Sequence, residues 1–141
     1  MSVRIVVDVS VLFGWVLGEQ GLFERANPVL LALKNARMLV PAIWQVEVGN
    51  VLLVKERQKR IDEAGVKKCL RFLEELNIEV DLGSATATFD RVVPLARRNQ
   101  LSAYDATYLE LALREKTPLA TFDEALRAAA KREGGELFEA A

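Results

Sequence analysis

The chain has 141 residues, with 19 basic and 20 acidic side chains and a formal net charge of −1. This length predicts a single domain over residues 1–141 that buries a core of its own. The near-neutral charge argues against a protein that coats nucleic acid through a uniformly basic surface, but it is compatible with a local basic groove. No apolar run is long enough to cross a bilayer and no signal peptide is visible, so we expect no membrane association.

Histidine is absent from the chain, and Cys69 is its single cysteine. A lone cysteine forms no internal disulfide, which predicts a cytoplasmic protein in a reducing compartment. Without histidine, Ser–His and Cys–His nucleophilic catalysis and a histidine general base are excluded, and a zinc site with the usual ligands is disfavoured. Any hydrolysis by this chain must therefore use carboxylates, whose hard oxygen ligands select Mg²⁺ or Mn²⁺.

Short apolar strands alternate with helical patterns along the chain. Strands are predicted at residues 3–7, 38–40, 78–80 and 118–120, with a last edge strand at 137–138. Helices are predicted at 10–17, 24–34, 42–56, 62–76, 84–98, 103–115 and 121–132, and a loop at 18–21. Ser84, Ser102 and Thr121 have the residue type and position of helix N-caps. The alternation predicts an α/β fold in which a short, central, parallel sheet is flanked by helices on both faces.

Four carboxylates stand at positions that one edge of this sheet would bring together. Asp8 ends the first strand and Asp123 follows the fourth, while Glu47 and Asp105 lie in the first two turns of helices that start near the same edge. Open α/β sheets bind their ligands at this carboxyl edge. Two unit charges 4 Å apart repel by about 4 kcal/mol at an effective dielectric constant near 20. The cluster therefore predicts bound divalent cations, which neutralise the acids and can hold a phosphodiester for hydrolysis.

Each acid also has an ordinary structural interpretation. Asp8 can cap the helix that follows it, Asp105 can complete a capping box with Ser102, and Asp123 can be a first-turn acid behind Thr121. Glu47 lies in a helix that is apolar nearly all round, without a basic residue three or four positions away. It therefore needs a cation from elsewhere or a proton, unless it emerges into solvent at the end of the helix.

Two further groups of polar residues fit such a site. Ser10, Thr121 and Asn50 flank the acids and can hydrogen-bond a carboxylate or a metal-bound water, although each also has an ordinary capping or packing role. Basic residues at the ends of two helices can line a track for RNA phosphates, or simply be solvated: Lys55, Arg57, Lys59 and Arg60 in one cluster, Arg97 and Arg98 in the other.

Four segments of the chain, at residues 5–12, 40–52, 101–109 and 119–123, together resemble the PIN-domain ribonucleases, in particular the VapC-type toxins of prokaryotic toxin–antitoxin pairs. The resemblance implies that Asp8, Glu47, Asp105 and Asp123 bind Mg²⁺ or Mn²⁺. It also implies cleavage of single-stranded RNA, a homodimer and inhibition by an antitoxin protein. Some relatives carry a further acid just after the position of Asp123, so Glu124 either assists a second metal or completes the helix cap.

The resulting hypothesis is a metal-dependent endoribonuclease. Asp8, Asp105 and Asp123 would hold the principal cation, with Glu47 ligating a second ion or orienting the attacking water. Two alternatives stay open: a receiver-like phosphoacceptor domain and a catalytically silent PIN-fold binding module. Apolar helices around Phe13, Trp15 and Phe72 predict a surface for a second copy of the chain or for an antitoxin segment.

Overall fold

Four parallel strands form the central sheet of the molecule. The computed structural model describes residues 3–17 and 21–139, so residues 18–20 of the predicted loop lie outside the described residues. The strand order is β3-β2-β1-β4, with bounds β1 (Val3–Val7), β2 (Ala36–Pro41), β3 (Ile78–Asp81) and β4 (Leu119–Ala120). Neighbouring strands all pair in parallel, as predicted. The expected edge strand at 137–138 is reduced to one parallel bridge between Leu137 and Leu119.

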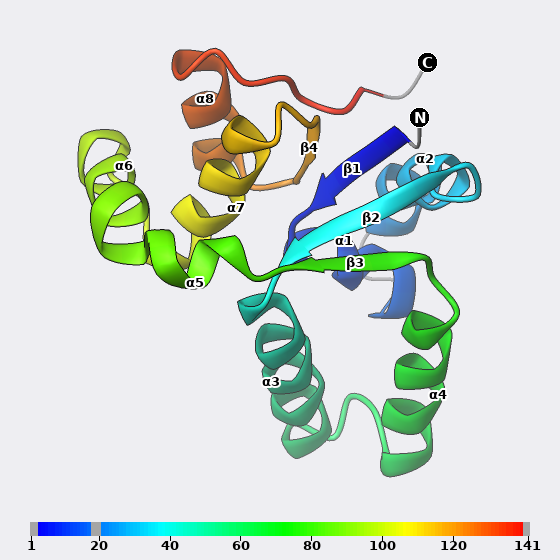
Figure 1. Cartoon of the computed structure of the whole chain (residues 1–141). Helices are drawn as coiled ribbons and strands as arrows, with labels where there is room; N and C mark the ends of the chain where they lie inside the picture. The colour runs from blue at the N-terminus through cyan, green and yellow to red at the C-terminus, as the bar shows by residue number, and fades with distance from the viewer. Residues whose placement is uncertain (1–2, 18–20, 140–141) are drawn as a thin grey trace.

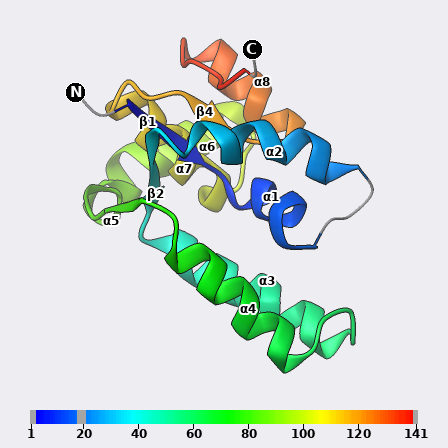
Figure 2. The same ribbon diagram turned by 90° about the vertical axis from the view of Figure 1, so that its right-hand side faces the viewer.

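Helices cover both faces of the sheet, which confirms the predicted α/β fold (Figures 1 and 2). They are α1 (Val9–Leu12), α2 (Leu22–Ala32), α3 (Ile43–Arg57), α4 (Glu63–Glu74), α5 (Gly83–Ala87), α6 (Val93–Asn99), α7 (Ala103–Arg114) and α8 (Glu124–Arg132), with π-helical segments η1 (Phe13–Leu17) and η2 (Thr88–Val92). Helix α7 packs against β1, β2 and β4, while α1 packs against α2 and α3. In the described part of the chain, none of the helices has both the length and the apolar character needed to span a membrane.

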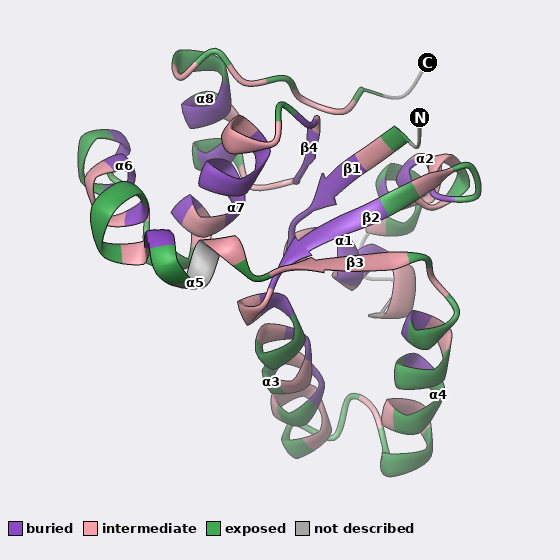
Figure 3. Ribbon diagram, viewed as in Figure 1, coloured by how far each residue is buried: buried purple, intermediate pink, exposed green. Residues whose placement is uncertain are grey.

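The main core joins the inner strands of the sheet to α7 and to buried residues of other helices, such as Leu12 of α1 and Val29 of α2. Val6 of β1 and Val40 of β2 are fully buried, as are Tyr108 and Leu109 of α7. Figure 3 shows the second halves of β1 and β2 in the purple of buried residues. Parallel strands covered on both faces require continuous apolar runs, which is the pattern of residues 5–7 and 38–40. Every residue of the edge strand β3 is only half-buried. The strand β1 is therefore the one that the core holds most firmly. Asp8, which follows β1 directly, is held with it.

Two predicted helix starts differ from the structure. The helix predicted at 84–98 is three consecutive segments, α5, η2 and α6, and it begins at Gly83 with Leu82 rather than Ser84 in the N-cap position. Pro94 lacks the backbone N–H of a regular helix, so a helical break near it has a physical cause. At α8, the N-cap is Asp123, whose side chain accepts a hydrogen bond from the Leu126 amide (2.8 Å), and not Thr121.

Helix α3 is less buried than its sequence predicted. Trp44, Val48 and Leu52 are buried along one side, but Val46 is 72 % exposed. The reason is that α3 and α4 leave the sheet as a projecting pair and contact each other (Figure 2). The side of α3 that faces away from α4 and the sheet therefore meets solvent, so an apolar sequence did not imply burial all round.

The apolar surface predicted for a partner is largely used within the chain. Phe13, Trp15 and Phe72 are all half-buried. The Trp15 indole N–H donates to the Ala26 carbonyl (2.8 Å), and the Trp15 and Phe72 ring centroids are 6.3 Å apart. These contacts stabilise the packing of η1 between α2 and α4, and they leave less apolar surface for a second protein than the sequence indicated.

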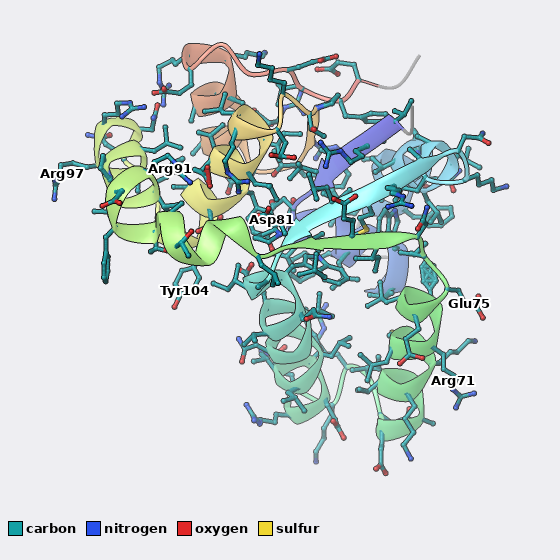
Figure 4. All side chains as sticks on the ribbon, viewed as in Figure 1. Arg71, Glu75, Asp81, Arg91, Arg97 and Tyr104 are labelled. Carbon is teal, nitrogen blue, oxygen red and sulfur yellow. The ribbon has the colours of Figure 1, made fainter. Side chains whose placement is uncertain are left out.

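Ion pairs tie the edge strand β3 to the sheet and to α7. Arg4 of β1 bonds to Glu79 (3.3 Å) and Glu115 (3.1 Å). Arg114 of α7 bonds to Asp81 (2.7 Å) and to the buried Glu110 (2.8 Å). Figure 4 shows Asp81 at the end of β3 and Arg91 on η2, both next to α7. The pairs fix α7, which carries part of the candidate site described below.

A pH dependence of stability follows from the contact between α6 and the end of α8. Glu133 accepts two hydrogen bonds from Arg98 (both 3.0 Å) and one from Asn99 (2.9 Å). The bonds from Arg98, and then that from Asn99, lower the pKa of Glu133 from its ordinary value of 4.5 to about 2. A lowered acid pKa stabilises the fold above the unfolded-state value, and this stabilisation is lost as the pH falls through the folded-state value.

We therefore expect Glu133→Gln to reduce the free energy of unfolding at neutral pH, and this deficit to shrink from pH 4.5 to about pH 2. Urea unfolding of both proteins at several pH values measures the difference. The exposed Glu136→Gln serves as the matched control and should differ little from wild type at any pH. A deficit that stays constant across this range would contradict the assignment of the linkage to Glu133.

Candidate metal-binding active site

Asp8 lies at the point where the order of the strands reverses. Chain connections run from β1 to β2 and β3 on one side, while β4 adds to the other side of β1. Ligands of open α/β sheets bind at the carboxyl ends of the strands at such a switch point. Asp8 follows β1 directly, is only 3 % exposed, and occupies the N-cap position of α1 without a side-chain capping bond. Helix capping therefore does not explain why a carboxylate occupies this position.

Two hydroxyl groups join Asp8 to the loop that follows β4. Thr121 donates to Oδ2 of Asp8 (2.7 Å) and accepts from the Asp123 amide (3.1 Å). Ser10 accepts from the Phe122 amide (3.0 Å), and its Oγ lies 3.3 Å from the Thr121 hydroxyl. Among the described residues, Oδ1 of Asp8 has no hydrogen-bond partner although it is buried. A buried, ionised carboxylate with one unpartnered oxygen is costly unless a cation binds it.

Glu47 and Asp105 approach the same region from two helices. Glu47 lies on the second turn of α3 and is half-buried, so it neither points freely into solvent nor sits in a closed core. Its Oε1 accepts a hydrogen bond of 2.5 Å from the hydroxyl of Tyr108. Asp105 lies on the first turn of α7, where its amide donates to the N-cap Ser102 (3.0 Å). Half of the predicted capping box is therefore present at α7.

The pKa shifts show that these carboxylates act on one another. Burial raises the pKa of Asp8, and the hydrogen bond from Thr121, followed by the nearby Ser10 hydroxyl and the backbone of Val9 and Ser10, partly opposes this rise. Burial also raises the pKa of Glu47, and the negative charges of Asp8 and Asp105 raise it further. The pKa of Asp105 is raised by burial first and then by Asp8 and Asp123. The four predicted acids therefore share one region of negative potential.

The residues present suit a hard divalent cation. Carboxylate and hydroxyl oxygens are the donors that Mg²⁺ and Mn²⁺ prefer, and the unpartnered Oδ1 of Asp8 offers one directly. In residues 3–17 and 21–139, however, no group of three or more acidic, cysteine or histidine side chains is arranged closely enough to hold a metal ion. Four like charges without a counterion repel one another. The metal set Asp8, Glu47, Asp105 and Asp123 therefore stays a prediction.

The other predicted site residues lie at different distances from Asp8. Ser10 and Thr121 are linked to it as described above, whereas Asn50 is exposed on α3. Glu124 is exposed at the first position of α8. Tyr108 was not predicted as part of the site. Its position three residues after Asp105, on the same face of α7, is the sequence signal that could have identified it.

The basic residues predicted to contact RNA lie away from the acids. Lys55 and Arg57 are in the last turn of α3, about 12 and 15 Å along the helix from Glu47 at 1.5 Å per residue. Lys59 and Arg60 follow that helix and are exposed. At the end of α6, Arg98 is engaged with Glu133, and Arg97 points away from the body of the molecule (Figure 4). Contact of these residues with RNA therefore stays a prediction.

Comparison with known proteins identifies the family. The sequence model of one protein family, the PIN domain, matches residues 5–132. The chain therefore belongs to the PIN domain family. PIN domains are generally nucleases, and PIN nucleases generally use divalent metals. This membership agrees with the parallel sheet and the acids at its carboxyl edge, and it sets aside the receiver-like alternative.

Two solved structures share the fold. PAE2754 from Pyrobaculum aerophilum is 24 % identical over 90 % of this chain and 79 % of that chain, with a TM-score of 0.65. VapBC2 from Rickettsia felis, bound to a DNA fragment from their promoter, is 13 % identical over 96 % of this chain and 97 % of that chain, with a TM-score of 0.63. At these identities the likeness establishes the fold alone. Among curated proteins, no sequence matches this chain.

Proposed function

We propose that the chain is a metal-dependent endoribonuclease that hydrolyses phosphodiester bonds of single-stranded RNA. The observation that carries the proposal is the unpartnered, buried Oδ1 of Asp8, set in the negative potential of Glu47, Asp105 and Asp123. A nuclease needs such a site because phosphodiester cleavage develops negative charge on phosphate oxygens, which repel carboxylates unless a cation lies between them. Membership of the PIN domain family supports the nuclease class.

In this proposal the residues of the chain have distinct tasks. Asp8, Asp105 and Asp123 would bind Mg²⁺ or Mn²⁺, and Glu47 would ligate a second ion or orient the attacking water. When bound, a divalent cation supplies Lewis-acid stabilisation of the charge that develops on the phosphate. Thr121 holds Oδ2 of Asp8 and leaves Oδ1 for the ion, while Ser10 fixes the loop that carries Thr121. With no histidine in the chain, the carboxylates alone supply the acid–base groups of the site.

The biological role that we propose is the toxin of a type II toxin–antitoxin pair in the cytoplasm. Support comes from the resemblance of the four sequence segments to VapC-type toxins and from the shared fold with a chain of the VapBC2 complex. An antitoxin protein and a homodimer are the partners that this role requires. The half-burial of Phe13, Trp15 and Phe72 means that neither partner is expected to bind mainly through these three residues.

A cleavage assay tests the nuclease. Purified protein, freed of metal by a chelator, should leave a single-stranded RNA oligonucleotide intact and should cleave it when Mn²⁺ or Mg²⁺ is restored. Single-stranded DNA and duplex RNA of the same sequence serve as matched substrates and should be cleaved more slowly. RNA cleavage that persists in excess chelator would contradict the proposal.

The same preparation separates the nuclease from a catalytically silent binding module. Mn²⁺ should raise the midpoint of thermal unfolding, because a ligand that binds only the native state stabilises it by mass action. A raised midpoint without cleavage of any RNA would favour a module that has kept its metal but not its activity. An unchanged midpoint together with no cleavage would contradict the metal site itself.

A further inference from the structure

Tyr108 joins the core of the domain to the carboxylate of Glu47. Its side chain is fully buried on α7, three residues after Asp105. The hydroxyl donates a hydrogen bond of 2.5 Å to Oε1 of Glu47, which is 61 residues away in sequence on α3. This bond links the buried core of the molecule to a helix that projects from the sheet (Figure 2).

Glu47 has few other means of being held in place. None of its helical neighbours at Ile43, Trp44, Asn50 and Val51 is basic, so no ion pair within α3 can fix its carboxylate. A glutamate side chain has three rotatable bonds, and a half-buried one is drawn toward solvent by hydration of its charge. The Tyr108 ring, in contrast, is immobilised by the packing around it. Its hydroxyl is therefore a fixed donor that restricts a mobile acceptor.

We propose that Tyr108 is a positioning residue, whose hydroxyl holds Oε1 of Glu47 so that this carboxylate stays directed at the region of Asp8 and Asp105. The expected effect on RNA cleavage rests on the proposed function, whereas the expected position of the Glu47 carboxylate does not. Tyr108 acts only through Glu47 in this account and does not contact the substrate. The negative charges of Asp8 and Asp105 act on Tyr108 as well as on Glu47, which supports their common location.

The substitution Tyr108→Phe tests this role because it removes the hydroxyl and keeps the packed ring. We expect cooperative thermal unfolding to be retained and the kcat of RNA cleavage to fall about ten- to a hundredfold, with KM changed by less than about twofold. The matched control is Tyr104→Phe, which removes the chain's other tyrosine hydroxyl from an exposed site on the same helix. This control should cleave RNA at the wild-type rate. Loss of cooperative unfolding in Tyr108→Phe, or an unchanged kcat, would overturn the proposal.

A double-mutant cycle shows whether Tyr108 acts through Glu47. In a Glu47→Ala background, Tyr108→Phe should cause no further loss of Mn²⁺ affinity or of cleavage, because the acceptor is already gone. Additive losses would assign the tyrosine a separate role and overturn the proposal.

Crystal structures separate this inference from the proposed function. The Glu47 carboxylate should move away from its wild-type position in Tyr108→Phe and keep that position in Tyr104→Phe, whether or not the protein cleaves RNA. An unmoved carboxylate would refute the positioning role even in an active nuclease. Failure of the wild-type protein to cleave any RNA would refute the nuclease alone.

Discussion

Asp8→Asn is expected to abolish metal-dependent RNA cleavage while making the metal-free protein more stable. The amide has the shape of the carboxylate and can still accept the hydrogen bond from Thr121, so the fold should persist. The substitution removes the charge at Oδ1, the buried oxygen without a partner. Since several kcal/mol of transition-state stabilisation depend on the cation, we expect cleavage to fall by about a hundredfold or more.

The gain in stability has a separate physical origin. Burial raises the pKa of Asp8, which means that the folded protein holds an ionised Asp8 at a cost in free energy at neutral pH. Removing that charge should raise both the free energy of unfolding and the midpoint of thermal unfolding of the metal-free protein. The stabilisation by added Mn²⁺ should disappear in the same variant.

Asp90→Asn is the matched control for this experiment, because Asp90 is an exposed carboxylate on η2 outside the candidate site. It should change neither the cleavage rate nor the effect of Mn²⁺ on unfolding. Full cleavage by Asp8→Asn would contradict the metal site, whereas a lower midpoint without metal would show that the Asp8 charge stabilises the fold.

Local patterns predicted the parts of the fold that local physics determines. The apolar run ending at Asp8, the alternation of strands and helices, and the N-cap at Ser102 all depend on neighbours within a few residues. The parallel sheet followed from that alternation because right-handed crossovers leave few other arrangements. The edge strand β3 and the projecting α3 were predicted as elements, but their exposure depends on what packs against them, and this is not a local property.

Long-range contacts explain what the sequence could not indicate. The bond between Tyr108 and Glu47 joins residues on two helices that are far apart in the chain. The sequence left two roles open for Thr121, a helix cap or a hydrogen bond to a carboxylate; in the folded chain its hydroxyl bonds to Asp8, and Asp123 caps the helix. In both cases a polar group had several partners available, and tertiary structure selected among them.

Arg114 makes the strongest electrostatic contribution that we expect to stability. Its guanidinium bonds to Glu110 through Nε (2.8 Å) and Nη2 (3.3 Å), and to Asp81 through Nη2 (2.7 Å) and Nη1 (3.3 Å). These carboxylates raise the pKa of Arg114 well above its ordinary value, first through the hydrogen bond with Asp81 and then through that with Glu110. Glu110 is only 4 % exposed, so the arginine neutralises a carboxylate that water barely reaches.

Arg114→Met should therefore lower the free energy of unfolding by about 3–5 kcal/mol, because it leaves Glu110 buried with only the longer contact to Arg91 (3.5 Å). Urea unfolding at neutral pH measures this loss, and the exposed Arg97→Met on α6 provides the matched control with little expected change. Adding Glu110→Met to Arg114→Met should restore much of the lost stability. Removing both charges costs less free energy of unfolding than leaving one charge buried without its partner. A loss below about 1 kcal/mol for Arg114→Met alone would show that the contact between β3 and α7 does not depend on this ion pair.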